Sequence, residues 1–248
     1  MKLILNCDDL GISESVNECI FALMEQEKVT SATLLMNCPF AEAAAAQLAR
    51  YSQCSFGVHL NATEFFPLTA HPGLKPILND KGEFAGNIRG VPLTSALRQG
   101  VFAEWSAQIE RAIALGVPVS HLDSHHHTHT IPALFGVLKA IQRKFGIRKV
   151  RLTRNVFACS DSKSSASLAS KALWNFMLRS YYSTKTTSGF GSFTAFYDRL
   201  RAGSGLRNET EVMCHPGGTN FKTENELLGG TWKQELPPGT QLISYNGL

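Results

Sequence analysis

Short apolar runs alternate with longer amphipathic stretches along most of this 248-residue chain. The apolar runs have the length of buried strands, and the stretches between them place their large apolar side chains at helical spacing. Predicted strands cover residues 2–7, 30–36, 55–60, 117–123, 149–153, 211–214 and 241–245. Predicted helices cover residues 13–27, 41–51, 103–115 and 132–145. Strands separated by helices predict an α/β protein built on a parallel sheet.

The chain length favours one closed or nearly closed (β/α) barrel, so we expect a single domain over residues 1–248. A doubly wound open sheet is the second choice, because no Gly-x-Gly-x-x-Gly motif follows the first predicted strand. Two stretches fit the alternation poorly. Residues 63–100 are rich in proline and glycine and predict loops, whereas residues 155–187 combine a serine-rich run with an amphipathic stretch. We interpret the latter as a lid or helical insertion, and a dimer contact or a surface excursion is an equally favoured alternative.

The composition is that of an ordinary globular protein, with 44% hydrophobic and 18% charged residues. Neither a signal peptide nor a run of ~18 apolar residues is evident, so we expect a cytoplasmic protein with no membrane span. The six cysteines show no Cys-x-x-Cys spacing and are interpreted as reduced core residues. The net charge of +4 is small, and the cations concentrated in residues 139–154 favour a solvated helix face over a nucleic-acid site. Arg151 or Arg154 could instead meet an anionic group on a substrate.

Residues 121–129 contain five of the eight histidines of the chain, together with the carboxylate of Asp123. Imidazole is the commonest protein ligand for divalent metals, so this density predicts a metal or catalytic site. The alternative is an accidental histidine-rich turn. Strand periodicity places His121, Asp123 and His125 on one side of their strand, so Asp123 and His125 can face one site together.

Acidic or imidazole side chains also stand where other predicted strands end. Asp8 and Asp9 follow the first strand, His59 the third, and His215 a late one. Each has a structural alternative, such as a turn for the Asp pair or a hydrogen-bonded core position for a lone histidine. Because the carboxyl ends of parallel strands share one face, we expect these residues to converge with Asp123 and His125.

Five sequence blocks occur in order along the chain: NCDDLGIS at 6–13, VTSAT at 29–33 with Met36 and Asn37, GVHL at 57–60, HLDSHHH at 121–127 and VMCHP at 212–216. They resemble the signature blocks of the YdjC-type carbohydrate deacetylases, which include chitooligosaccharide deacetylase. The resemblance implies a distorted TIM-like barrel of the polysaccharide deacetylase type, which we expect to have seven strands. It also implies removal of acetyl groups from N-acetylglucosamine-containing oligosaccharides with one divalent metal. Residues 155–187 are longer and richer in serine than we expect of this family.

The same resemblance implies roles for individual residues. Asp9, His59 and His125 correspond to metal ligands, Asp8 to the general base and His215 to a candidate general acid. It points to Mg²⁺, whereas two imidazoles and a carboxylate also suit Zn²⁺. We expect Asp123 to orient a histidine. Further residues expected to contact a ligand residue or the substrate are His127, Arg151 and Phe190.

The leading hypothesis is therefore a metal-dependent N-deacetylase of chitooligosaccharides, with phosphorylated chitobiose as one candidate substrate and a homodimer as one candidate assembly. A metal-dependent phosphoesterase on a similar barrel is a second enzyme hypothesis, but it would need a second metal and more bridging carboxylates. A non-catalytic metal-binding or sugar-binding protein is the third. That hypothesis predicts several ions per chain and no role for Asp8, whereas the enzyme predicts one ion.

Overall fold

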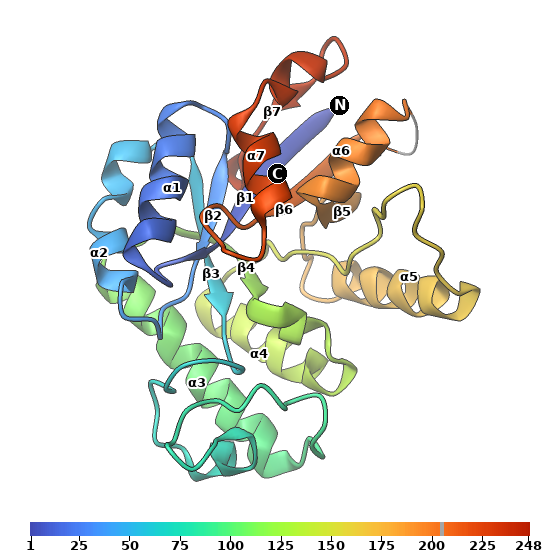
Figure 1. The fold of residues 1–248 in the computed structure, drawn as a ribbon. Coiled ribbons are helices and arrows are strands. Elements are labelled where there is room, and N and C mark those ends of the chain that lie inside the picture. Colours follow the sequence, from blue (N-terminus) through green and yellow to red (C-terminus); the bar gives the residue numbers. More distant parts are fainter. Residues whose placement is uncertain (204–205) are drawn as a thin grey trace.

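A curled parallel sheet forms the centre of the computed structural model, which describes residues 1–203 and 206–248 (Figure 1). Its strands run in the order β4-β3-β2-β1-β6-β5, and β7 pairs with β1. Every pairing between the named strands is parallel. The strands are β1 (Lys2–Leu10), β2 (Ser31–Leu34), β3 (Ser55–Leu60), β4 (Val119–Ser124), β5 (Gly189–Ser192), β6 (Glu209–Cys214) and β7 (Gln241–Leu242). The predicted α/β class and parallel sheet are confirmed.

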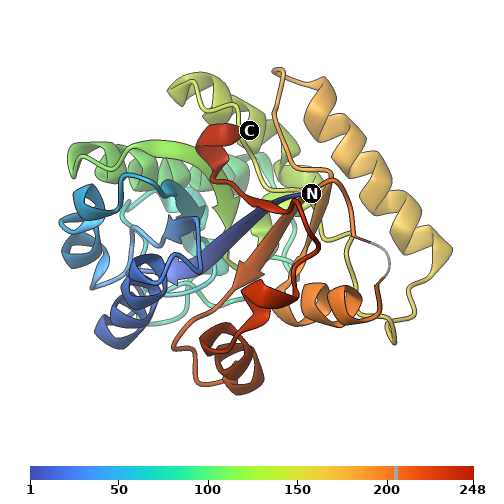
Figure 2. The same cartoon turned by 90° about the horizontal axis from the view of Figure 1, so that it is seen from above.

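Helices surround the sheet on its outer side (Figure 2). They are α1 (Glu14–Glu25), α2 (Ala41–Ala45), α3 (Ser95–Ala114), α4 (Phe135–Phe145), α5 (Ser165–Ser180), α6 (Phe193–Arg201) and α7 (Lys222–Gly229), with short 3₁₀ turns between them. The Ser13 hydroxyl caps α1 by accepting the backbone N–H of Val16, and Ile20 and Met24 on its inner face are fully buried. In the described part of the chain, none of the helices has both the length and the apolar character to cross a membrane.

The sheet is open between β4 and β5, so the closed seven-stranded barrel is not found. Residues 149–153 were expected to be a regular strand, but they make only isolated bridges, Leu122 with Val150 and Lys149 with Lys185. The backbone N–H of Thr153 donates to the side chain of Asn175 on α5 (2.9 Å) and not to a neighbouring strand. Because a side chain from the insertion takes this hydrogen bond, the ladder stops and the sheet stays open.

The segments outside the predicted alternation are partly helical. Helix α3 begins at Ser95, eight residues before the expected start, because Thr94 caps it and Leu97 and Val101 are buried. Residues 155–187 contain α5, as the insertion hypothesis requires. Helices α6 and α7 were not predicted. A lid function for α5 and a single-domain organisation stay predictions.

Candidate active site

The two consecutive carboxylates of β1 face the same site because the strand is irregular there. In a regular strand, neighbouring side chains point to opposite faces. The register of β1 against β2 shifts between Cys7 and Leu10, and Asp9 has a φ of 66°. This left-handed torsion is uncommon for a residue other than glycine and often marks a functional position. It turns Asp9 toward the face that Asp8 already occupies.

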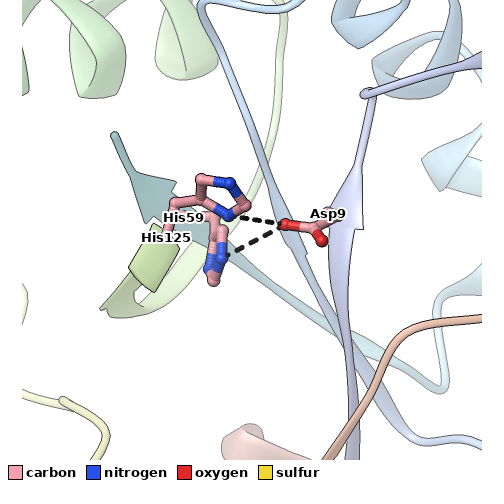
Figure 3. A group of neighbouring side chains, drawn as sticks. All are labelled: Asp9, His59 and His125. Atoms are coloured by element: carbon pink, nitrogen blue, oxygen red, sulfur yellow. Dashed lines mark ion pairs between the residues drawn. The ribbon is translucent and has the colours of Figure 1, made fainter. Parts of the chain in front are cut away.

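Asp9, His59 and His125 come together at the carboxyl end of the sheet (Figure 3). Asp9 Oδ1 lies 3.4 Å from His59 Nε2 and 2.9 Å from His125 Nδ1. One ligand atom from each of the three residues lies within 4.8 Å of the others. Neutral imidazole nitrogens and a carboxylate oxygen at this spacing can share one divalent cation.

Two other groups of three ligand atoms occur among the described residues, Asp8 with His59 and Asp123, and Glu64 with His125 and His126. The carboxylates of Asp8 and Asp123 already have a cationic partner, the buried Arg151 guanidinium. Asp9 Oδ1 is buried, and the atoms nearest to it in this group are ring nitrogens, His125 Nδ1 and His59 Nε2, not an arginine. A buried carboxylate that faces two imidazoles and no guanidinium favours a cation, so the Asp9 group fits a metal best.

Asp123 contacts the ring nitrogen of His59 that faces away from Asp9. The two residues lie opposite each other in the β3–β4 register, and His59 Nδ1 is 2.7 Å from Asp123 Oδ1. A hydrogen bond from Nδ1–H to the carboxylate leaves the lone pair of Nε2 directed at Asp9. Thr33 on β2 donates its hydroxyl to Asp123 Oδ2 and completes the arrangement.

Arg151 is fully buried and pairs with three carboxylates. Its guanidinium contacts Asp8 through two bonds of 2.7 Å, Asp123 at 2.6 Å and Glu211 at 2.7 Å. Burial alone would raise the pKa of Asp8, but the charge of Arg151 and its neighbours hold that pKa well below its usual value. Asp8 is therefore ionised at neutral pH. Arg151 has no surface left for a substrate anion, which corrects one of the two roles expected for it.

His127 and Phe190 lie against this buried arginine. The Phe190 ring is fully buried, with the Arg151 guanidinium 4.8 Å from its centroid and His127 edge-on at 5.8 Å. Burial, and then the charge of Arg151, lower the pKa of His127 to about 3, so its imidazole is neutral. His126 and His127 have φ of 50° and 54°, a second strained stretch at the site. Phe190 packs in the core and cannot form an exposed sugar-stacking wall.

His215 follows β6, which pairs with β1 on the side away from β2 and β3. Its backbone N–H donates to Glu224 Oε1 (2.6 Å), and its Nδ1 lies 3.4 Å from the same oxygen. The Phe221 ring stacks on the imidazole, with centroids 4.1 Å apart. Burial lowers the pKa of His215, but Glu224, Asp8 and Asp9 together raise it above its usual value. A histidine held in this way is suited to donate a proton.

Three glutamates of this region were not predicted. Glu64 lies beside His125 and His126, Glu211 pairs with Arg151, and Glu224 holds His215. Glu211 lies inside the predicted strand at 211–214, and a buried carboxylate there indicates a cationic side chain as its ion-pair partner. Glu64 lies in an irregular segment, and Glu224 lies in the first turn of α7, a helix that was not predicted, so neither position could be derived from sequence periodicity.

Fold and site together define an α/β protein with a candidate metal-dependent hydrolytic centre. A family model for YdjC-like proteins matches residues 2–237, and this chain belongs to that family. A carbohydrate deacetylase from Halalkalibacterium halodurans is 32% identical over 219 residues, covering 87% of this chain and 85% of the relative. One from Geobacillus stearothermophilus is 38% identical over 153 residues, 61% of this chain and 60% of the relative.

Solved structures share the fold. A candidate cellobiose-phosphate cleavage protein from Enterococcus faecalis superimposes with a TM-score of 0.74 at 23% identity, covering 99% of this chain and 98% of the other. A mutant CE4-family pseudoenzyme with restored activity gives a TM-score of 0.50 at 12% identity, covering all of this chain and 66% of the other. At these identities the likeness concerns the fold alone.

Proposed function

We propose that this protein is a metal-dependent hydrolase that removes N-acetyl groups from N-acetylglucosamine-containing oligosaccharides. The carbohydrate deacetylases among its relatives support the enzyme class. One observation carries the proposal from the site itself: an Asp-His-His group lies beside an ionised carboxylate, Asp8, and a histidine of raised pKa, His215, follows the strand that pairs with β1.

Asp9, His59 and His125 are the residues that would hold the cation. When bound, a divalent cation there would make water more acidic and polarise the acetamide carbonyl. We assign Mg²⁺ to this position from the family resemblance. Zn²⁺ is the alternative, because imidazole nitrogen is a better donor for zinc than for magnesium.

Asp8 is the proposed general base. Arg151 donates hydrogen bonds to both carboxylate oxygens of Asp8, and the Asn6 amide donates to Oδ1 (2.9 Å). These bonds hold the carboxylate in one orientation. His59 Nε2 is 4.0 Å from Asp8 Oδ2, which puts Asp8 beside the proposed ligands. A base in this position takes the proton of the attacking water as its oxygen bonds to the acetyl carbon.

His215 is the proposed general acid. The amide C–N bond breaks when the leaving nitrogen receives a proton, and acetate and a free amino sugar result. Glu224, 3.4 Å from His215 Nδ1, is among the groups that raise the pKa of His215 and so favour its protonated form. Proton transfers of this kind contribute about 10²- to 10⁴-fold each.

The sugar accepted is proposed to include phosphorylated chitobiose. A pocket of about 500 Å³ adjoins His215, and the cationic side chains of Arg154 and Lys222 line it together with the hydroxyls of Ser192 and Thr194. Guanidinium and ammonium groups with hydroxyl donors suit a phosphate. The structural neighbour described for cellobiose-phosphate cleavage agrees with a phosphorylated disaccharide.

A phosphoesterase is disfavoured by the same contacts. Two-metal phosphoester hydrolysis needs carboxylates free to bridge a second ion. Asp8 and Asp123 instead bond to Arg151. The non-catalytic hypothesis leaves Asp8 without a role, although Arg151 and Asn6 hold its carboxylate beside the proposed ligands.

The test is acetate release from N,N′-diacetylchitobiose and from its phosphate by metal-free protein, with Mg²⁺, Zn²⁺, Mn²⁺ or Co²⁺ added back singly. We expect acetate with at least one metal. A matched control is Arg154→Gln, which should raise KM for the phosphate ester and leave the unphosphorylated sugar unaffected. No acetate from either sugar with any metal would contradict the proposed activity.

A further inference from the structure

A network of buried polar side chains lies under the loop that follows β3. Gln108 on α3 bonds both backbone groups of Asn61, each at 2.8 Å. Asn61 Oδ1 in turn accepts the backbone N–H groups of Thr63 (2.9 Å) and Glu64 (3.3 Å). Asn61 and Gln108 are fully buried. A buried polar network in which each group is paired holds its parts in one geometry.

This network positions one residue, Glu64. Its carbonyl accepts hydrogen bonds from the side-chain amides of Asn61 (2.9 Å) and Asn37 (3.1 Å). The next residue, Phe65, has a φ of 62°, so the chain turns sharply after Glu64. The backbone of Glu64 is thereby fixed, although its side chain is 45% exposed.

The Glu64 carboxylate lies against His125 on the side away from Asp9. Glu64 Oε2 is 3.4 Å from His125 Nε2, and Asp9 Oδ1 is 2.9 Å from His125 Nδ1. His125 therefore lies between two carboxylates, one at each ring nitrogen. Asp123 and Asp9 flank His59 in the same manner, at Nδ1 and Nε2.

We propose that Glu64 is a positioning residue of the metal site. Its carboxylate lies 3.4 Å from His125 Nε2, where it can accept the Nε2–H and leave Nδ1 free for the cation, as Asp123 does for Nε2 of His59. This inference rests on the proposed metal-dependent function. Carboxylates behind metal-binding histidines fix the tautomer and raise the basicity of the ligand, and their loss typically lowers metal affinity by about 10- to 100-fold.

The alternative is a second cation among Glu64, His125 and His126, whose ligand atoms also lie close together. A neutral imidazole has only one nitrogen with a free lone pair. If Nδ1 of His125 faces a cation beside Asp9, Nε2 carries the proton and is a donor. Glu64 then receives a hydrogen bond, and the site holds one ion.

The test is calorimetric titration of Zn²⁺ into metal-free wild type, Glu64→Ala and Glu64→Gln. Glu83→Gln is the matched control, because this carboxylate lies in the same part of the chain and bonds Asn79 instead. We expect Glu64→Ala to weaken Zn²⁺ binding by about 10- to 100-fold. Glu64→Gln should weaken it less, since an amide oxygen still accepts, and Glu83→Gln should match wild type.

Long-range ¹H–¹⁵N spectra of Zn²⁺-bound protein supply a second readout. In wild type, His125 should carry its proton on Nε2 and the metal on Nδ1. Wild-type affinity in Glu64→Ala, or metal on Nε2 of His125, would overturn the inference. A higher KM with unchanged Zn²⁺ affinity would overturn it too, since Glu64 would then be a substrate contact. Failure of wild type to bind any metal would instead contradict the proposed function.

Discussion

The φ angle of Asp9 decides whether both carboxylates of the first strand can face the site. The Asp8-Asp9 pair and the histidines could be found in the sequence, because acidic and imidazole groups rarely end several buried strands for packing reasons alone. The sequence could not show that Asp9 has a φ of 66°, which allows neighbouring carboxylates to face one site. Nor could it show that Arg151 pairs with Asp8 and leaves Asp9 for a cation. Side-chain partners at this scale depend on contacts across the sheet.

Replacing Asp8 by Asn should separate catalysis from metal binding. The variant keeps the size of the side chain but loses the carboxylate that accepts a proton. We expect kcat for acetate release to fall by about 10²- to 10⁴-fold while Zn²⁺ affinity stays within a few-fold of wild type. Near-normal turnover would remove Asp8 from the base role, and parallel loss of metal would make it a ligand.

Glu224→Gln should change the pH dependence. Burial lowers the pKa of His215, whereas Glu224 is among the groups that raise it above the usual value. An acid must be protonated to act, so activity falls as pH rises through this pKa. Without the Glu224 charge the pKa drops, and the alkaline limb of kcat should move to lower pH. Glu226→Gln, at an exposed position of the same helix, should leave the limb in place. An unmoved limb in Glu224→Gln would contradict the assignment of His215.

At the scale of elements, the helices with long apolar periodicity were predictable. Segments whose backbone is bonded by side chains from elsewhere in the chain were not. Helices α1 and α4 follow apolar spacing that survives in the fold, with bounds close to those expected. Residues 149–153 have a strand-like composition, but Asn175 takes the hydrogen bond that a strand would need. Helix α5 joins the body of the molecule through the buried side chains of Trp174 and Leu178 and also through polar contacts, which apolar periodicity does not report.

Lys139 is the clearest of these contacts. Its buried ammonium donates to the carbonyls of Leu178 and Tyr181 (2.8 and 3.0 Å) and to the hydroxyl of Thr184 (2.8 Å), which ties α4 to the end of α5. Lys139→Met leaves buried acceptors without a donor, so we expect a loss of about 1–3 kcal/mol in urea unfolding. Lys144→Met, which removes an exposed pair with Glu110 and exposed contacts with the Phe102 and Phe145 rings, should cost about 1 kcal/mol. Equal effects of the two changes would contradict this role.

The whole molecule is built on a curled sheet. Polar side chains of the candidate site lie at the carboxyl ends of its strands, and the segment around Tyr245, near the end of the chain, packs against β3 and β4. The parallel order of the strands followed from their alternation with helices. The open edge of the sheet and the packing of the segment around Tyr245 could not be predicted, because both depend on contacts between residues distant in sequence. Tyr245 stacks on His121 with ring centroids 3.6 Å apart, and its hydroxyl donates to Glu211. Burial raises the pKa of Glu211 to about 7.

Tyr245→Ala should therefore destabilise the entire fold. The change removes a fully buried aromatic ring and leaves Glu211 without its phenolic donor, so we expect a loss of about 3–5 kcal/mol in the free energy of unfolding. Tyr245→Phe keeps the ring and should cost about 1 kcal/mol. Chemical denaturation measures both, and a loss below about 1 kcal/mol for the alanine variant would contradict the packing role of this segment.

The most direct measurement is a titration of metal-free protein with the cation that restores acetate release, following the rate at each addition. One ion shared by Asp9, His59 and His125 predicts a rate that rises linearly and stops rising at one equivalent per chain, and no such rise for His59→Ala. Full activity of the metal-free protein, or a rate that saturates only at two equivalents, would contradict the account.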